Sequence, residues 1–234
     1  MMIRCWTALL LAAGVCSALG SRAAEAPAWP DTPLARLEAL ALIQTLNAEI
    51  LSSNSATLTL EHWCREHALA DPAVILAHRT EQGSEAASEG VSAAVRADLE
   101  VSARQSVHYR RVELTCGEQV LSVAENWYVP ARLTAQMNRL LERTQTPFGK
   151  VVQPLRPHRE TKAADLLWTP LPDGWERGAH APAAADASPQ PLDFPMALFE
   201  HRAILYTPAH QPLAEVHEVY QRGILAFPQP QLPH

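Results

Sequence analysis

The stretch from residue 107 to residue 149 places the strongest limits on what this chain can fold into. Residues 107–116 and 120–129 are both rich in valine, leucine, tyrosine and tryptophan, and only three residues separate them, which is short enough for a hairpin. The two segments are therefore predicted to be antiparallel neighbours in a sheet. Pro130 ends the second segment, because proline cannot donate a hydrogen bond to a strand ladder.

A helix is predicted directly after this hairpin and is expected to cover the sheet. Thr134 can cap its first turn, and its apolar residues share one face: Leu133, Met137, Leu140 and Leu141. Thr146-Pro147-Phe148-Gly149 is expected to form a turn that ends it. Proline forces the preceding residue out of the helical region, and glycine permits close backbone approach.

The rest of the chain contains both helical and extended patterns. Strong helix formers fill residues 34–51, and a second helix capped by Thr59 is expected to reach Leu69. Extended segments are expected at 73–80, 150–152, 159–168, 197–207 and 213–227. Residues 81–90 are polar and predicted to be a loop. Residues 170–195 are rich in proline and alanine. They have too little apolar surface for its burial to offset the conformational entropy lost on ordering, so they are predicted to be a mobile loop.

Residues 1–26 have the layout of a secretory signal peptide. Arg4 precedes a short apolar run, and small residues follow between Gly20 and Ala26, where cleavage is expected. The apolar run is too short to remain as a membrane span. We therefore expect a periplasmic or secreted protein whose mature part, residues 27–234, is a single domain, since 234 residues with 47% hydrophobic content suit one well-buried core.

Charge and cysteine usage limit the partners and the covalent structure. A net charge of −6 without a basic cluster argues against a nucleic-acid partner. Removal of the leader leaves Cys64 and Cys116, which either form one disulfide in an oxidising compartment or stay as buried thiols. No histidine pair has the spacing of a zinc site, since His62 and His67 fall on different faces of a helix, so neither a metal nor a cofactor is expected.

The central stretch resembles the chorismate lyase family, the chorismate-pyruvate lyases, whose fold is shared by ligand-binding domains of some transcription regulators. The likeness is carried by Arg111 followed five places later by Cys116, by Val129-Pro130, by Thr-Pro-Phe-Gly where the family has Thr-Pro-Leu-Gly, and by Gln211-Pro212-Leu213 running into His217-Glu218-Val219-Tyr220. The resemblance implies an α+β fold in which helices cover a single antiparallel sheet of about six strands. On this basis residues 96–103, ambiguous by pattern, are expected to form a strand.

Arg111 is the first site residue that the resemblance implies, because the family's matching arginine contacts the ligand. A guanidinium on a strand inside a concave sheet offers two parallel donors to a carboxylate. The alternation of the strand points the other way. Arg110, and not Arg111, shares a face with the apolar Val112 and Leu114. Arg110 is therefore kept as the alternative.

Glu218 is the implied catalytic residue, because the family's glutamate lies beside the departing enolpyruvyl group. A carboxyl in an apolar pocket would have a raised pKa and could transfer a proton. Glu215 falls on the opposite face of the strand, and Val216 and Tyr220 favour Glu218 as the inward one. A glutamate at a solvated strand edge is the simpler structural interpretation.

Three further positions match ligand contacts of the family. Phe148 stands where the family has a ligand-contacting leucine, and Ala56 and Thr57 lie in a Ser-Ala-Thr segment where the family has Ser-Met-Thr. Together these positions imply a chorismate lyase-like protein that binds a small aromatic carboxylate and, as an enzyme, eliminates pyruvate from chorismate to give a hydroxybenzoate. With the signal peptide layout of residues 1–26, we expect it to be exported, and we expect a monomer. The alternative is a non-catalytic ligand-binding or structural protein of the periplasm, favoured because chorismate is made in the cytoplasm.

Overall fold

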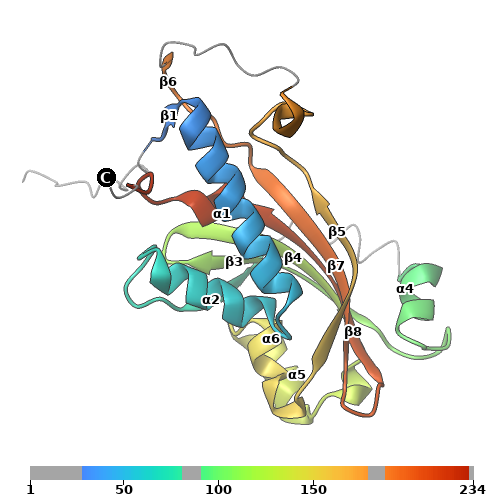
Figure 1. Cartoon of the computed structure of the whole chain (residues 1–234). Helices are drawn as coiled ribbons and strands as arrows, with labels where there is room; N and C mark the ends of the chain where they lie inside the picture. The colour runs from blue at the N-terminus through green and yellow to red at the C-terminus, as the bar shows by residue number, and fades with distance from the viewer. Residues whose placement is uncertain (1–27, 81–90, 179–187, 232–234) are drawn as a thin grey trace, which may run out of the picture.

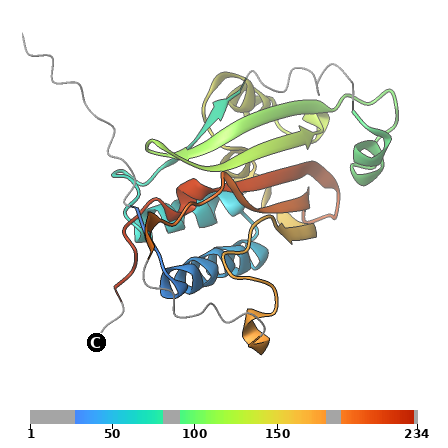
Figure 2. The same cartoon turned by 90° about the horizontal axis from the view of Figure 1, so that it is seen from above.

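The structure is a computed structural model that describes residues 28–80, 91–178 and 188–231. Its centre is a six-stranded antiparallel sheet in the order β2-β3-β4-β8-β7-β5 (Figure 1). Helices α1 and α2 lie together on one face of this sheet (Figure 2). The predicted α+β class, with one main antiparallel sheet of about six strands, is therefore confirmed.

The elements have the following bounds. The strands of the main sheet are β2 (Ile75–Arg79), β3 (His108–Cys116), β4 (Gln119–Tyr128), β5 (His158–Leu166), β7 (Ala197–Tyr206) and β8 (Pro212–Gln221). The helices are α1 (Pro33–Leu51), α2 (Ala56–Glu66), α4 (Ala93–Asp98), α5 (Ala135–Arg143) and α6 (Phe148–Val151). Short 3-10 turns span Pro130–Arg132, Gln153–Leu155, Trp175–Arg177 and Arg222–Leu225. A separate two-stranded sheet pairs β1 (Pro30–Asp31) with β6 (Ser188–Pro191).

The predicted hairpin is formed by β3 and β4. Gly117, in the turn between them, has a φ of 55°, in the left-handed region that glycine adopts without strain. A Cβ at this position would lie 2.8 Å from the Cβ of Ala70, so the turn also needs the missing side chain for space. The turn thus fixes the centre of the sheet against the loop that follows α2.

Helix α1 buries one of its faces. Thr32 caps it by accepting a hydrogen bond from the backbone N–H of Ala35 at 3.1 Å, and Pro33 occupies the first turn, where its missing N–H costs nothing. Its buried residues recur every three or four positions: Ala35, Ala39, Ile43, Leu46 and Ile50. The helix predicted for residues 34–51 is confirmed.

Several element predictions were wrong. Residues 96–103 were expected to form a strand, but α4 occupies the start of this segment because Ser92 caps it and alanines favour the helix. Helix α2 begins at Ala56 and not after Thr59, because Ser55 supplies the capping oxygen. Residues 150–152, expected to be extended, belong to α6 and the turn after it.

The predicted loop at 170–195 is partly structured. Trp175–Arg177 forms a 3-10 turn, and Ser188–Pro191 pairs with β1. Residues 179–187 of this segment, the predicted polar loop at 81–90 and the predicted signal peptide at 1–26 lie outside the described residues. Within the described ranges no helix combines the length and apolar character needed to cross a membrane.

Candidate functional site

A small cavity lies between the helix-covered face of the sheet and the starts of α2 and α6. Its volume is about 30 Å³, close to the space of one water molecule and well below that of an ordinary ligand pocket. Its apolar wall is made by Val112, Leu114, Ala124, Leu205 and Val216. Its polar lining includes Asn126, Arg159 and Glu218. A few polar groups facing an apolar wall are typical of sites that orient small molecules.

The starts of α2 and α6 bring three of the predicted site residues together. Ala56, Thr57 and Phe148 all line the cavity. A Cβ on Gly149 would lie 2.7 Å from Oγ1 of Thr57, so glycine is what lets the two segments approach so closely. The backbone N–H groups of Ala56 and Thr57 have no acceptor among the described residues. Free N–H groups in a first helical turn favour negatively charged or oxygen-bearing ligands.

Glu218 lies on the cavity side of β8, as the strand alternation predicts. There it forms an ion pair with Arg159. Its Oε2 is 2.8 Å from Nη2 of Arg159, with the two side chains 8% and 3% exposed, and it accepts a hydrogen bond from the Tyr220 hydroxyl at 3.1 Å. Burial lowers the pKa of Arg159, but the Glu218 carboxylate outweighs this effect and raises it. Burial, followed by the Glu218 charge, raises the pKa of Tyr220. Glu218 is thus a counter-charge for Arg159.

His201 extends this buried cluster towards α1. It is completely buried on β7, with Nε2 2.7 Å from Oδ1 of Asn47, whereas its Nδ1 has no hydrogen-bond partner. Burial, together with the charge of Arg159, lowers the pKa of His201 to about 4, so the ring is neutral at pH 7. Neither Arg159 nor His201 was among the predicted site residues. Arg159 lies between His158 and Glu160, and His201 lies between Glu200 and Arg202, so no local sequence pattern indicates that either residue is buried.

Arg111 does not reach the cavity, which corrects the position expected from the resemblance. Its side chain is on the opposite face of the sheet, 35% exposed, with Nη1 3.5 Å from Oε1 of Glu125. Successive residues of a strand point to opposite faces, so the inward position belongs to Arg110, the alternative from the sequence analysis.

Arg110 is a buried cation without a carboxylate partner in the described structure. It is 5% exposed, its two Nη atoms donate to the carbonyl oxygen of Thr146 at 3.3 and 3.4 Å, and its Nε has no partner. Burial and the nearby Arg79 charge lower its pKa to about 10. Arg110 does not line the cavity, but its Cα pairs across the strands with Asn126, which does. Positive charge therefore lies unneutralised beside the cavity.

Cys64 and Cys116 form a disulfide that joins α2 to the end of β3, with their Cα atoms 6.4 Å apart. Of the two alternatives for these cysteines, the structure shows the disulfide. The bond fixes the helical layer, which carries Ala56 and Thr57, to the hairpin of the sheet.

A larger hollow of about 560 Å³ lies at the other end of β4, between the hairpin turn and the Arg222–Leu225 turn. Its charged lining residues, Glu118, Asp193 and Arg222, are all exposed. Gln221, a buried polar residue of its lining, already donates to the carbonyl oxygen of Val219 at 2.9 Å, and no buried charged group is found among its described lining residues. The smaller cavity, which is lined by the buried Glu218, is therefore the better candidate.

The structure also brings together residues that could hold a metal ion, where the sequence analysis expected none. In the described ranges, His158, Glu160 and His210 form such a group. Their spacing in the sequence gives no zinc motif, because His210 comes from a turn about fifty residues beyond the other two.

Comparisons with known proteins give one strong match. No protein-family model matches the chain. Among solved structures, the ligand-binding domain of a protein described as a GntR-family transcriptional regulator from Bordetella bronchiseptica is 16% identical, with a TM-score of 0.34, over 56% of this chain and 74% of that one. Gene product SA0254 of Staphylococcus aureus is 11% identical, with a TM-score of 0.39, over 77% and 96%.

The strong match is to a protein of Sinorhizobium fredii. The uncharacterized protein y4mC of strain NBRC 101917 / NGR234 is 44% identical to this chain over 204 residues, which is 87% of the chain and 84% of the relative. An identity this high over most of both chains means that they share a fold and an ancestry. The chain belongs to the same family as protein y4mC of Sinorhizobium fredii.

Proposed function

We propose that the protein binds a small aromatic carboxylate, without turning it over, between the sheet and the starts of α2 and α6. The observation that carries this proposal is Arg110, a buried guanidinium with no carboxylate partner among the described residues, next to an apolar-walled cavity. Burying a charge without a partner is costly, and a ligand carboxylate would supply the missing charge.

The cavity walls suit the rest of such a ligand. The apolar side chains of β3, β4 and β8 would contact the ring, as Val112 and Val216 face the cavity. The free N–H groups of Ala56 and Thr57 would donate to a second oxygen of the ligand, such as a ring hydroxyl.

Binding requires the cavity to open. A volume of about 30 Å³ does not hold an aromatic acid, so α6 must move away from α2. Helix α6 has four residues and meets α2 through the close approach at Gly149. We therefore expect binding to be accompanied by a displacement of Phe148–Val151.

Thermal unfolding with hydroxybenzoates tests the proposal. A ligand at ~100 times its dissociation constant should stabilise the protein by roughly 2.7 kcal/mol, which is measurable as a rise in melting temperature. Arg110→Met keeps the length of the side chain and removes the charge, so it should abolish this rise. Arg111→Met is the matched control, because it removes the neighbouring charge on the other face, and it should preserve the rise.

Two results would contradict the proposal. One is the absence of any melting shift with a panel of aromatic acids. The other is a full shift in Arg110→Met, which would show that the buried cation has no part in binding. Since Arg110→Met also removes an unpaired buried charge, its unliganded stability is measured alongside.

Elimination of pyruvate from chorismate is the second candidate, favoured by the position of Glu218 in the cavity lining. The pairing of Glu218 with Arg159 and Tyr220 argues against a free proton donor. Incubation with chorismate while following 4-hydroxybenzoate absorbance decides between the two. If the unaltered protein turns over chorismate and Glu218→Gln does not, the protein is a lyase. If the unaltered protein shows no turnover, it is a binding protein.

We propose that the protein is exported to the periplasm or secreted. The signal peptide layout of residues 1–26 supports this, and so does the Cys64–Cys116 disulfide, since disulfides persist mainly in oxidising compartments. Cell fractionation with a C-terminal tag tests it. Recovery of the uncleaved chain in the cytoplasmic fraction would exclude export.

A further inference from the structure

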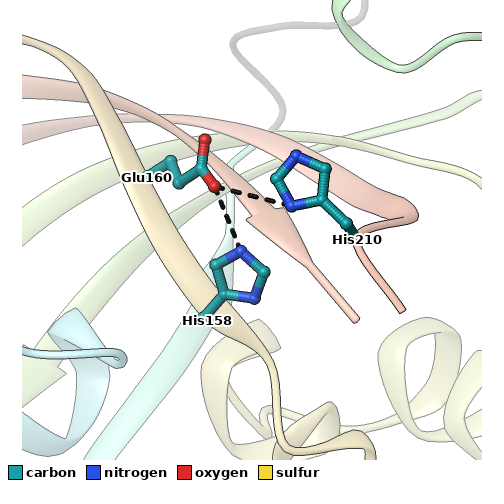
Figure 3. Close-up of side chains that lie close together, drawn as sticks. All are labelled: His158, Glu160 and His210. Carbon is teal, nitrogen blue, oxygen red and sulfur yellow. Dashed lines mark hydrogen bonds and ion pairs between the residues drawn. The ribbon is translucent and has the colours of Figure 1, made fainter. Parts of the chain in front are cut away.

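Three metal-ligating side chains meet at one end of the main sheet (Figure 3), where His158 and Glu160 lie on the face of β5 opposite to the cavity-lining Arg159. Their potential ligand atoms all lie within 4.8 Å of one another. Nε2 of His158 is 3.1 Å and Nδ1 of His210 is 3.7 Å from the same carboxylate oxygen, Oε1 of Glu160. Two imidazole nitrogens thus lie close to the same carboxylate oxygen.

The fold positions these groups from two separate segments. His158 and Glu160 are two apart on β5, so their side chains share one face of this edge strand. His210 lies in the turn between β7 and β8, where a φ of 59° and a hydrogen bond from its N–H to Thr207 O at 2.9 Å direct it back towards β5. The antiparallel pairing of β5 with β7 brings the two segments together.

Tyr206 fixes the two imidazole rings. Its ring stacks on that of His210, with centroids 4.5 Å apart and an interplanar angle of 4°, and on that of His158 at 5.3 Å and 17°. The two histidine rings are themselves nearly parallel, with an angle of 19°. Stacking limits their rotation, so less entropy is lost when an ion orders them.

We propose that His158, Glu160 and His210 bind a divalent transition-metal ion of the zinc class. Ligand bonds of about 2.0–2.1 Å in a tetrahedral site place neighbouring ligand atoms about 3.3 Å apart, and the two distances to Glu160 lie on either side of this value. Two imidazole nitrogens select zinc or copper over magnesium and calcium, which prefer oxygen ligands. The side chains are 38%, 49% and 67% exposed, which leaves room for water as a fourth ligand.

A bound ion would link the edge strand β5 to the hairpin formed by β7 and β8. Strand β5 has β7 on one side only, so its other edge makes no ladder hydrogen bonds within the described sheet. An ion joining β5 to the β7–β8 turn would hold this edge in place. This inference is independent of the proposed carboxylate binding.

Cobalt(II) and zinc(II) titrations of the mature protein test the site. Cobalt in a site with two nitrogens and one oxygen gives visible absorption bands, and zinc should displace it at one equivalent. His158→Ala and His210→Ala should each weaken zinc binding in calorimetry at least tenfold and remove the bands. Glu160→Gln, which keeps the size of the side chain, should weaken binding as well. Magnesium and calcium should have no effect.

The control variant is His62→Ala. His62 pairs with Glu66 at 2.9 Å on an exposed face of α2, and no third potential ligand joins them in the part of the chain that the structure describes. This variant should bind zinc as the unaltered protein does. All variants are checked by circular dichroism, and the altered side chains are exposed enough for the fold to be retained. Identical zinc affinity in the double variant His158→Ala/His210→Ala and the unaltered protein would overturn the proposal, as would an absence of zinc binding at micromolar concentrations.

Discussion

Glu218 and Arg159 are both buried, so each depends on the other for its charge balance. Glu218→Gln would leave the Arg159 guanidinium in the core without a counter-charge, and loss of one partner of a buried ion pair typically costs about 3–5 kcal/mol. We expect a loss of this size in the free energy of unfolding, measured by urea denaturation. The double variant Arg159→Met/Glu218→Leu should recover most of it, since two apolar side chains need no counter-charge.

Glu215→Gln is the matched control for this experiment. Glu215 lies on the same strand but on the opposite face, where burial and the nearby Asp98 raise its pKa. Removal of its charge should therefore be neutral or slightly stabilising. Equal losses for Glu215→Gln and Glu218→Gln would mean that the Arg159 pair has no special role.

For single residues, strand alternation predicted the direction of side chains better than the family resemblance did. Alternation placed Arg110 and Glu218 inward, and both are buried in the structure. The family match named Arg111, which is on the other face. Arg159 and His201 were not predicted, because both are flanked by polar or charged residues, a pattern that usually indicates a solvated strand. Only the pairing of distant strands shows that these two lie under α1 and α2.

The outer face of the sheet carries a cross-strand row that should make stability depend on pH. Glu125 accepts from Tyr109 at 2.6 Å and lies 3.2 Å from Nδ1 of His217, whose Nε2 is 3.0 Å from Glu200. The hydrogen bond between Glu125 and His217 is the largest cause of both pKa shifts. It lowers the pKa of Glu125 to about 2 and raises the pKa of His217.

The signs of these shifts define where stability is gained and lost. The contribution of Glu125 is full above pH 4.5 and is lost as the pH falls towards about 2. The contribution of His217 is full below its unfolded pKa of 6.5 and is lost as the pH rises through its raised folded pKa. His217→Ala should therefore cost more unfolding free energy at pH 5.5 than at pH 8.5.

Denaturant titrations at the two pH values measure this difference. His108→Ala is the control, since this exposed histidine of β3 has no ion pair within the described ranges. The change in cost between the two pH values for His217→Ala is read relative to that for His108→Ala and should be the larger of the two. A cost for His217→Ala that does not change with pH would contradict the assigned pairing.

The contact between α2 and α6 depends on a glycine. A Cβ at Gly149 would lie 2.7 Å from Oγ1 and 3.2 Å from Cβ of Thr57, so Gly149→Ala should lower the free energy of unfolding by about 1–3 kcal/mol through overpacking. The double variant Gly149→Ala/Thr57→Ala removes the nearest atom and should recover part of this loss. An undiminished melting temperature in Gly149→Ala would show that α6 moves away freely.

Element predictions succeeded where local sequence decides the structure and failed at the boundaries. The β3–β4 hairpin and α1 follow from apolar pattern, turn and capping residues that lie within the elements themselves. Segment 96–103 was assigned a strand against its alanines, and α4 forms because Val95 and Leu99 pack on Val129, the residue that directly follows β4. The pairing of β1 with β6 joins segments about 160 residues apart, and no local pattern shows it.

The disulfide connects the two layers of the molecule, so its effect belongs to the whole fold. Cys64 on α2 and Cys116 on β3 are both completely buried and are separated by 52 residues in sequence. Closing a loop of this length in the unfolded chain lowers its entropy, which corresponds to roughly 4 kcal/mol of stability in the chain-entropy description. Reduction should therefore lower the denaturant midpoint of the protein substantially.

Unfolding with and without dithiothreitol measures this contribution. The double variant Cys64→Ala/Cys116→Ala should match the reduced protein and show no further response to the reductant. The intact mature chain should also have a mass two units below that of its reduced form. Two thiols that alkylate in the native protein before any reductant is added would mean that the layers are held by packing alone, and the case for an oxidising compartment would lose its structural support.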